Sequence, residues 1–182
     1  MDNGACSYRR FLDGDECAFD EIMNELFYSL IYFINRYVHD FHTAEDLAMD
    51  TFADLLVHRH RYNFKVTLKT YLFMIGRSRA LDYLKRKSTV SFVELNEAIT
   101  VQGDEKSLEE AVINDERKQI VSSAIAKLPE DMQIAVHLFY FEDMTYQEIA
   151  RVMKKNEKQV DNLLYRAKKE LRAILDKDGE LL

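Results

Sequence analysis

Apolar residues recur every three or four positions along most of this chain, which is the spacing that places them on one face of an α-helix. The first such stretch runs from Asp15 to about Val38 and predicts a helix buried in a core. Its broad apolar face consists of Phe19, Ile22, Met23, Leu26, Phe27, Leu30, Ile31, Ile34 and Val38. A second helix is expected to begin at Thr43, whose hydroxyl can cap the first turn, and to run through Leu56.

A third helix is predicted from about Leu68 to Lys87, after a polar and basic loop at residues 59–67. The side chains that we expect this helix to direct into a core are Tyr71, Leu72, Phe73, Ile75, Ala80, Leu81 and Leu84. The basic side chains that should point away from the core are Lys69, Arg77, Arg79, Lys85, Arg86 and Lys87. Three helices are enough for one small bundle, so residues 1–90 are predicted to form a domain.

The helical periodicity fails after Ser88, and residues 91–106 are predicted to form a flexible acidic linker. A second domain of about four helices is expected in residues 107–182. Ser107 and Glu110 have the form of a capping box at its start, and Pro129 should end one helix and open the next. The packed side of that next helix is expected to contain Ile134, Val136, Leu138, Phe139 and Phe141. The predicted fold class is therefore all-α, with two small helical domains joined by a flexible linker.

Residues 145–171 show the pattern of a helix-turn-helix. Thr145 with Glu148, and Asn156 with Gln159, have the form of capping boxes, in which each side chain satisfies the other residue's backbone N–H. Apolar residues continue at helical spacing between and after these caps, at Ile149, Ala150, Met153, Val160, Leu163, Leu164, Ala167 and Leu171. The small Ala150 would let the second helix cross closely over the first.

The second helix of this motif leaves a polar face outward, made of Lys158, Gln159, Asp161, Asn162, Tyr165, Arg166 and Lys169. Asn, Gln and Arg can pair bidentately with base edges in a major groove, and lysines contact phosphates. The pattern indicates a DNA-reading helix, with the solvated surface of an ordinary helical hairpin as the alternative. One detail departs from the usual motif: Lys154 or Lys155 stands in the turn where a Gly would avoid strain of about 1 kcal/mol.

Charge is segregated along the chain, although its net value is only −7. Residues 59–88 contain nine Lys or Arg and one Asp, and residues 151–172 contain eight basic and three acidic residues. Residues 1–58, in contrast, contain twelve acidic and three basic residues. Such blocks suggest two contacts with polyanions, while the acidic parts face solvent or a different partner.

Aromatic residues interleave with the first basic block, at Tyr62, Phe64, Tyr71 and Tyr83. Aromatic rings beside a positively charged groove are what the binding of unpaired bases requires. Packing in the core is the alternative, and the helical phase favours it for Tyr71. For Tyr62 and Phe64, on the loop, both interpretations stay open.

Composition narrows the class of protein. The 182 residues are 47% apolar with only five Gly and one Pro, which favours packed helices over disorder. Cys6 and Cys17 form neither a zinc quartet nor a disulfide framework, so a reducing compartment is expected. No apolar run approaches the roughly 20 residues of a membrane span. We therefore expect a cytoplasmic protein.

Catalytic and metal-dependent functions find little support in the sequence. The pairs His39 with His42 and His58 with His60 lack further ligands at metal-binding spacing. Neither a phosphate-binding Gly loop nor a nucleophile with an orienting base is recognisable. We expect no metal, no cofactor and no enzymatic activity.

Two long segments resemble a known family. Residues 44–87, beginning AEDLAMDTF, resemble region 2 of bacterial sigma factors of the extracytoplasmic-function group. Residues 128–175, which include TYQEIARVM, resemble region 4 of the same group. The resemblance implies a sigma factor that binds core RNA polymerase, through the β′ clamp and the β flap, and promoter DNA. An anti-sigma factor is a further candidate partner.

The resemblance also implies which residues make each contact. Those implied for the clamp of core polymerase are Glu45, Asp46, Leu47, Asp50, Thr51 and Phe52. Those implied for the minus-ten promoter element are Arg61, Tyr62, Asn63, Phe64, Arg77, Ser78, Arg79, Lys85 and Arg86. Those implied for the minus-thirty-five element are Asn156, Lys158, Gln159, Asn162, Tyr165, Arg166 and Lys169. The chain departs from the family pattern at Met49, usually Gln, at Ser78 and Arg79, often Asn and Leu, and at Leu163, often Arg.

Two other functions could use the same segments. A sigma-like decoy would sequester an anti-sigma factor and never touch promoters, but it would not need the two basic blocks. A self-sufficient regulator would dimerise through residues 1–88 and bind a palindromic operator without polymerase. Promoter-specific initiation with core RNA polymerase is the function that the sequence favours.

Overall fold

In a computed structural model that describes residues 3–93 and 116–179, the chain is helical and divides into two compact units. The first unit holds α1 (Asn3–Leu12), α2 (Cys17–Val38), α3 (Phe41–Val57) and α4 (Leu68–Val93). The second holds α5 (Glu116–Ala126), α6 (Glu130–Tyr140), α7 (Tyr146–Met153) and α8 (Glu157–Gly179). The all-helical class is confirmed. The predicted linker beyond residue 93 and the predicted cap at Ser107 lie outside the described residues.

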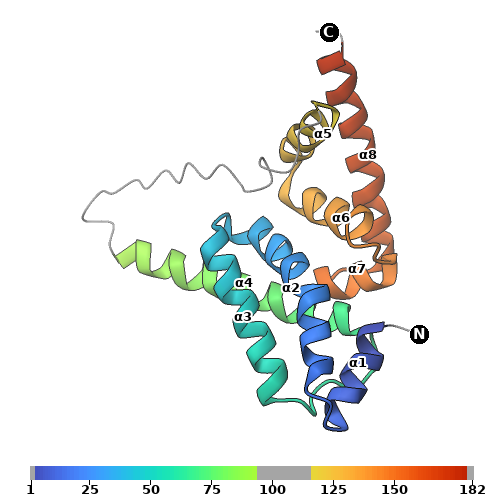
Figure 1. The fold of residues 1–182 in the computed structure, drawn as a ribbon. Coiled ribbons are helices and arrows are strands. Elements are labelled where there is room, and N and C mark those ends of the chain that lie inside the picture. Colours follow the sequence, from blue (N-terminus) through green and yellow to red (C-terminus); the bar gives the residue numbers. More distant parts are fainter. Residues whose placement is uncertain (1–2, 94–115, 180–182) are drawn as a thin grey trace. The chain divides into compact units, whose positions relative to one another are not determined.

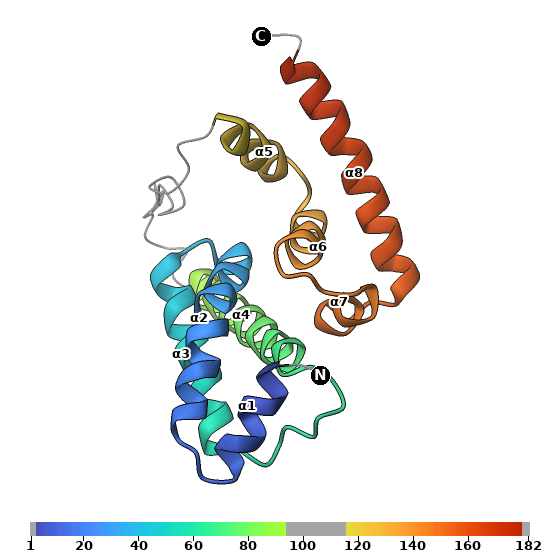
Figure 2. The same cartoon turned by 45° about the vertical axis from the view of Figure 1, so that its right-hand side comes forward.

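The core of the first unit forms around α2, against which α1, α3 and α4 all pack (Figures 1 and 2). Because three helices cover it, α2 buries a face wide enough to enclose Ile22, Leu30, Ile31, Phe33 and Ile34 completely. The prediction of a core helix is confirmed. Burying this much apolar side chain supplies the main stabilisation of such a bundle, at about 25 cal/mol for each Å² removed from water.

The close packing of α4 on α2 depends on Gly76. A Cβ atom at this position would lie 2.9 Å from Leu30 Cδ1 and 3.2 Å from Ile34 Cδ1. Only a residue without a side chain lets the two helices approach this closely. The buried side of α4 repeats every four residues, at Leu68, Leu72, Gly76 and Ala80.

Leu81 was expected to face the core, and that expectation is wrong. It follows Ala80 directly and so lies about 100° around the helix from the buried side. The side chain is 38% exposed. In addition, α4 continues to Val93, past the predicted end at Lys87.

Helix α1 is a feature that the apolar pattern did not reveal. It is short, and its apolar contact with the rest of the unit rests on few residues, chiefly Tyr8 and Phe11, which are buried. On its charged side, Arg10 pairs with Asp15, just before α2, at 2.6 Å and with Glu21 of α2 at 2.9 Å. These pairs are solvent-exposed and therefore contribute little to the free energy of folding.

The N-cap of α3 is Asp40, whereas the sequence had suggested Thr43. Asp40 Oδ1 accepts a hydrogen bond from the Thr43 backbone N–H at 2.6 Å, so Thr43 lies inside the first turn. Both residue types can cap a helix, and the sequence alone does not show which of them adopts the extended conformation of a cap. Here Asp40 has it, with φ −148° and ψ 112°.

Asp40→Ala should lower the free energy of unfolding of the first unit by about 1 kcal/mol, the usual cost of losing a cap. The hydrogen bond from the Thr43 backbone N–H holds the pKa of Asp40 below its ordinary value. The contribution of the cap is therefore present above the pKa of the unfolded carboxyl, about 4, and is lost as the pH falls through the lower folded value. Urea unfolding of the parent protein and of the Asp40→Ala variant, at pH 7 and at pH 3, measures this contribution. The exposed Asp13→Ala is the control, and an equal loss in that variant would contradict the role of the cap.

The second unit is organised by α8, which packs against α5, α6 and α7. Its core contains the buried residues Leu138, Ile149, Val160, Leu164 and Ala167. Pro129 is the residue before α6, as predicted, and Glu130 and Asp131 occupy the first turn. In the described residues, no helix is long and apolar enough to cross a membrane.

Phe141 was expected to pack beneath the helix-turn-helix, and this is also wrong. Helix α6 ends at Tyr140, and Phe141 is its C-cap, with 60% of its surface exposed. Its ring stacks on that of His137, with 5.6 Å between centroids and 20° between planes. The end of the helix thus turns this side chain outward.

Candidate nucleic-acid interface

Two reciprocal caps fix the helix-turn-helix formed by α7 and α8. At α7, Thr145 Oγ1 accepts from the Glu148 backbone N–H at 3.3 Å, and Glu148 Oε2 accepts from the Thr145 backbone N–H at 2.9 Å. At α8, Asn156 Oδ1 accepts from the Gln159 N–H at 2.8 Å, and Gln159 Oε1 accepts from the Asn156 N–H at 2.9 Å. Both predicted capping devices are present. They hold the start of α8 in its helical conformation before any ligand binds.

The turn between the two helices places Lys154 in the left-handed region, with φ 53° and ψ 44°. The Lys154 N–H donates to the Arg151 carbonyl at 3.3 Å, and the Lys155 N–H donates to the Ala150 carbonyl at 2.9 Å. This is the hydrogen-bonding pattern with which helices commonly end in a left-handed residue, usually Gly. A lysine with its Cβ atom is therefore strained at this position.

Lys154→Gly is expected to raise the free energy of unfolding of the second unit by about 1 kcal/mol, because Gly adopts positive φ without a steric cost. Thermal and urea unfolding of the full chain measure the gain. Lys154→Ala is the matched control, since it removes the same charge and keeps the Cβ atom. An equal gain in the alanine variant would attribute the effect to charge and not to backbone strain.

The predicted reading residues of α8 all lie on the solvent side of the helix-turn-helix. We define the reader face as the exposed residues Asn156, Lys158, Gln159, Asn162, Tyr165, Arg166 and Lys169. Asn156 and Gln159 use their side-chain oxygens in the cap, which leaves their amide N–H groups for other partners. Within the part of the chain that the structure describes, the side chains of Asn162 and Arg166 make no hydrogen bond or ion pair. Both are thus available to a ligand.

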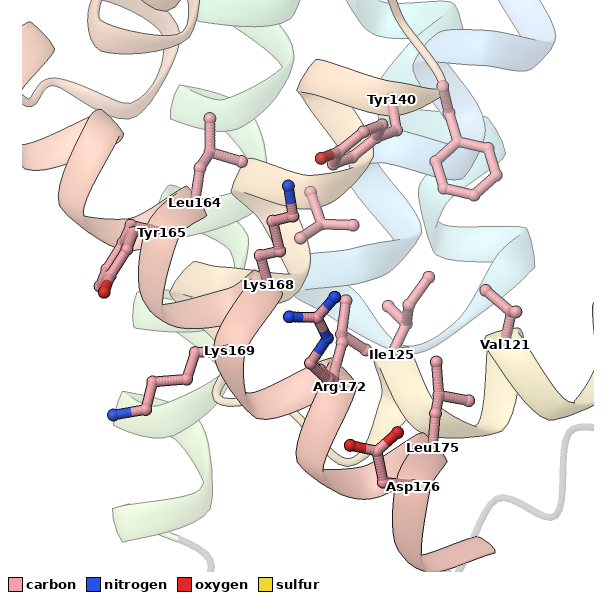
Figure 3. Close-up of a pocket in the computed structure, with 13 residues that line it drawn as sticks. Val121, Ile125, Tyr140, Leu164, Tyr165, Lys168, Lys169, Arg172, Leu175 and Asp176 are labelled. Atoms are coloured by element: carbon pink, nitrogen blue, oxygen red, sulfur yellow. The ribbon is translucent and has the colours of Figure 1, made fainter. Parts of the chain in front are cut away.

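An apolar groove lies beside the reader face, between α5, α6 and α8 (Figure 3). Its apolar lining consists of Val121, Ile125, Val136, Tyr140, Phe141, Leu164, Leu171 and Leu175. In Figure 3, Lys168 and Arg172 extend from α8 over the groove, while Tyr165 and Lys169 lie along the outer side of that helix. The groove therefore has an apolar floor and a largely basic rim, with Asp176 at one end. No signal in the sequence pointed to it.

In the first unit, the loop after α3 is held by its aromatic residues. Tyr62 is only 3% exposed, its hydroxyl donates to the Val66 carbonyl at 2.6 Å, and its ring lies 5.1 Å from that of Tyr71. The structure thus settles the open question for Tyr62 in favour of packing. Burial also raises the pKa of the Tyr71 hydroxyl above its ordinary value. Arg61 and Asn63 are exposed, and Phe64 is half-buried with φ 59°.

The predicted residues of α4 do not all face solvent in the same way. Ser78, Lys85 and Arg86 are exposed, whereas Arg77 is half-buried. Arg79 turns toward α3, where its guanidinium lies 3.8 Å from Asp50 and 3.7 Å from Asp54. Arg79, one of the residues that depart from the family pattern, therefore links α3 and α4.

Of the residues predicted to contact polymerase, only some lie on the surface of α3. Glu45, Asp46 and Asp50 are exposed and Leu47 is half-buried, but Thr51 and Phe52 belong to the core. The Thr51 hydroxyl donates to the Leu47 carbonyl at 2.7 Å, so this buried polar group has a hydrogen-bond partner within its own helix. The exposed apolar residues of the same helix are Met49, Leu56 and Val57, and Val57 is 74% exposed. Of these three, only Met49 was named from the sequence in connection with the polymerase contact, as a departure from the Gln usual in the family.

The described ranges contain no group of three or more His, Cys, Asp or Glu residues that could hold a metal ion. His58 Nδ1 lies 3.0 Å from Asp54 Oδ1, one turn earlier on α3.

Comparison with known proteins finds two segments of the chain that match two regions of the same family. Residues 22–90 match Sigma-70 region 2, and residues 118–171 match Sigma-70, region 4. The chain is similar to the ECF RNA polymerase sigma factor SigM of Bacillus subtilis, with 24% identity over 87% of this chain and 95% of that protein. It is also similar to the RNA polymerase sigma-H factor of Pseudomonas aeruginosa, with 31% identity over 85% of this chain and 84% of that protein.

Solved structures share the fold. The sigma factor RpoE of Bartonella quintana, solved with the anti-sigma factor NepR, aligns with a TM-score of 0.68 over 87% of this chain and 96% of its own. CnrH, solved with the cytosolic domain of CnrY, aligns with a TM-score of 0.65 over 97% and 99%. Both are 18% identical to this chain, so these similarities concern the fold.

Proposed function

This chain belongs to the sigma-70 family, in its extracytoplasmic-function group, and we propose that its two units make separate contacts with RNA polymerase and with the promoter. It is an initiation factor and not an enzyme. It binds core RNA polymerase and directs transcription from specific promoters, and we place this activity in the cytoplasm.

One observation carries the assignment of promoter recognition to the second unit. The reader helix α8 begins with a cap that is complete within the protein, and its Asn162 and Arg166 side chains make no hydrogen bond or ion pair with any other residue that the structure describes. These are side-chain types that pair with adenine and guanine edges, respectively, in the major groove. The lysines at positions 158 and 169 flank them and would contact phosphates. We assign this face to the minus-thirty-five element.

The first unit would bind polymerase through α3 and the minus-ten element through the loop and α4. On α3, exposed carboxylates stand beside exposed apolar residues, a combination that suits a basic protein surface better than DNA. We assign Glu45, Asp46 and Asp50, together with Met49 and Val57, to the clamp of β′. The loop and α4 present Arg61, Asn63, Lys85 and Arg86, which suit single-stranded DNA.

We assign the groove of the second unit to the flap of the β subunit. Its apolar floor suits an amphipathic segment, and its rim cations Lys168 and Arg172 suit acidic side chains on that segment. An anti-sigma factor, of the kind present in the RpoE structure, is the partner that we expect to compete with polymerase.

Neither unit needs to bind DNA tightly alone. When polymerase holds both units, the second DNA contact becomes intramolecular, and the joint affinity greatly exceeds that of either contact. Initiation with purified core RNA polymerase over a library of promoters tests the proposed function. Transcripts that depend on this chain, and that share two spaced sequence elements, are the expected result. A palindromic footprint obtained without polymerase would favour a self-sufficient regulator, and an inability to support any transcript would favour a decoy.

A further inference from the structure

We propose that α1, acting through Tyr8, holds the 59–67 loop in the conformation that reads the minus-ten element. Tyr8 would thus be a positioning residue for promoter recognition. The inference rests on the proposed function of this loop. It concerns a helix that lies outside the matched region, which begins at residue 22.

The Tyr8 hydroxyl joins α1 to the junction between α3 and the loop. The side chain is completely buried, and its hydroxyl lies 2.8 Å from the Arg59 carbonyl and 3.3 Å from the Leu55 carbonyl. Leu55 is in the last turn of α3, where carbonyls have no partner within the helix, and Arg59 is the first residue of the loop. One donor thus reaches both carbonyls and determines where the loop leaves α3. A tyrosine hydroxyl keeps its proton at physiological pH, and burial raises the pKa of Tyr8 further, to about 12.

The aromatic rings of the loop pack on the same residue. The Tyr8 ring lies 5.4 Å from that of Tyr62 and 6.3 Å from that of Phe64. Next to Tyr8, the Arg9 guanidinium lies 5.0 Å from the centroid of the Phe64 ring, a cation–π contact. In the opposite direction, the Arg59 guanidinium lies 5.5 Å from the Phe11 ring of α1. Four contacts from three residues within about one turn of α1 therefore connect this helix to the loop.

The backbone of the loop needs such support. Phe64 has φ 59°, a conformation that is strained for a residue with a side chain unless packing compensates for it. The turn around it is closed from within by Asn63 Oδ1, which accepts from the Lys65 N–H at 3.1 Å. The exposed residues Arg61, Asn63 and Lys65 project from this turn. Their positions relative to DNA therefore depend on rings that α1 holds in place.

The test is Tyr8→Phe in the full chain with core RNA polymerase, measured over all single substitutions of the minus-ten element. The phenylalanine keeps the ring and removes the hydroxyl, so the junction loses its donor while the core stays filled. Initiation should fall about fivefold, the factor expected from one lost hydrogen bond, and the base preference at one or two positions should broaden. Arg9→Ala, which leaves the core untouched, should broaden the same positions to a smaller extent. Binding to core polymerase should stay unchanged in both.

Two further variants serve as a control and as a test of the loop itself. Tyr32→Phe is the matched control, because Tyr32 packs on Phe41 at the other end of the α2–α3 hairpin. Asn63→Ala alters the loop directly and tests the proposed function. If Asn63→Ala changes the preference while Tyr8→Phe and Arg9→Ala both behave like Tyr32→Phe, α1 does not position the loop. A uniform loss at all promoters in Tyr8→Phe and Arg9→Ala overturns the inference as well, since it reports stability alone. An unchanged preference in Asn63→Ala overturns the assignment of the loop itself, and the inference with it.

Discussion

Replacement of Glu45 and Asp46 by lysine should lower the affinity for core RNA polymerase by about a hundredfold or more, because opposed like charges at an interface cost several kcal/mol. Both carboxylates are exposed on α3, so the free protein should lose less than about 1 kcal/mol of stability. Asp50 is left unchanged in this variant. Its carboxylate lies 3.8 Å from Arg79, and a lysine there would disturb the contact between α3 and α4.

Asp13→Lys combined with Asp20→Lys provides the control for this experiment. These two residues are exposed in the same unit, and the change in net charge is identical. Titration of labelled core polymerase with each protein, at two salt concentrations, gives the affinities. If both double variants bind polymerase equally well, the acidic surface of α3 is not the clamp contact.

Asn162→Ala and Arg166→Ala should each relax the base preference at particular positions of the minus-thirty-five element. A bidentate contact from either side chain would discriminate by roughly 1–3 kcal/mol, which corresponds to about five- to 150-fold in initiation. The expectation is strengthened by the absence, in the described part of the chain, of any hydrogen bond or ion pair from these side chains. Arg166 in particular forms no ion pair with Asp161 or Glu170, the two carboxylates near it on α8.

Lys158→Ala is the matched variant on the same helix. As an exposed point charge, Lys158 should contact phosphate, so its loss should weaken all promoters by about the same factor. Initiation by the three variants over every single substitution of the upstream element separates base reading from phosphate contact. Binding to core polymerase should be the same in all of them. Equal, uniform responses from Asn162→Ala, Arg166→Ala and Lys158→Ala would refute base reading by α8.

The helix-turn-helix could be predicted nearly residue by residue because its signals are local. A cap and its partner lie three residues apart, so Thr145 with Glu148 and Asn156 with Gln159 can be recognised without knowledge of the fold. The strained turn residue was narrowed to two lysines for the same reason, and Lys154 is the one with positive φ.

Other features depend on contacts that are distant in sequence. Nothing near Tyr8 shows that its hydroxyl reaches residues 55 and 59, and nothing near Arg79 shows that it faces Asp50 and Asp54. Helix α1 was missed because two buried rings are too few to produce a periodic pattern. Burial of Tyr62 likewise results from rings on α1 and α4 that meet only in the folded unit.

The groove of the second unit has two side chains in common with the reader face, Tyr165 and Lys169. A protein segment in the groove and DNA on α8 are therefore linked ligands of one helix. If a ligand in the groove changes the affinity for the minus-thirty-five element by some factor, that element changes the affinity for the groove ligand by the same factor. A segment that leaves Tyr165 and Lys169 free can assist promoter binding, whereas one that covers them must oppose it. A polymerase subunit and an inhibitor could thus occupy the same apolar floor and have opposite effects, according to how far each extends across α8.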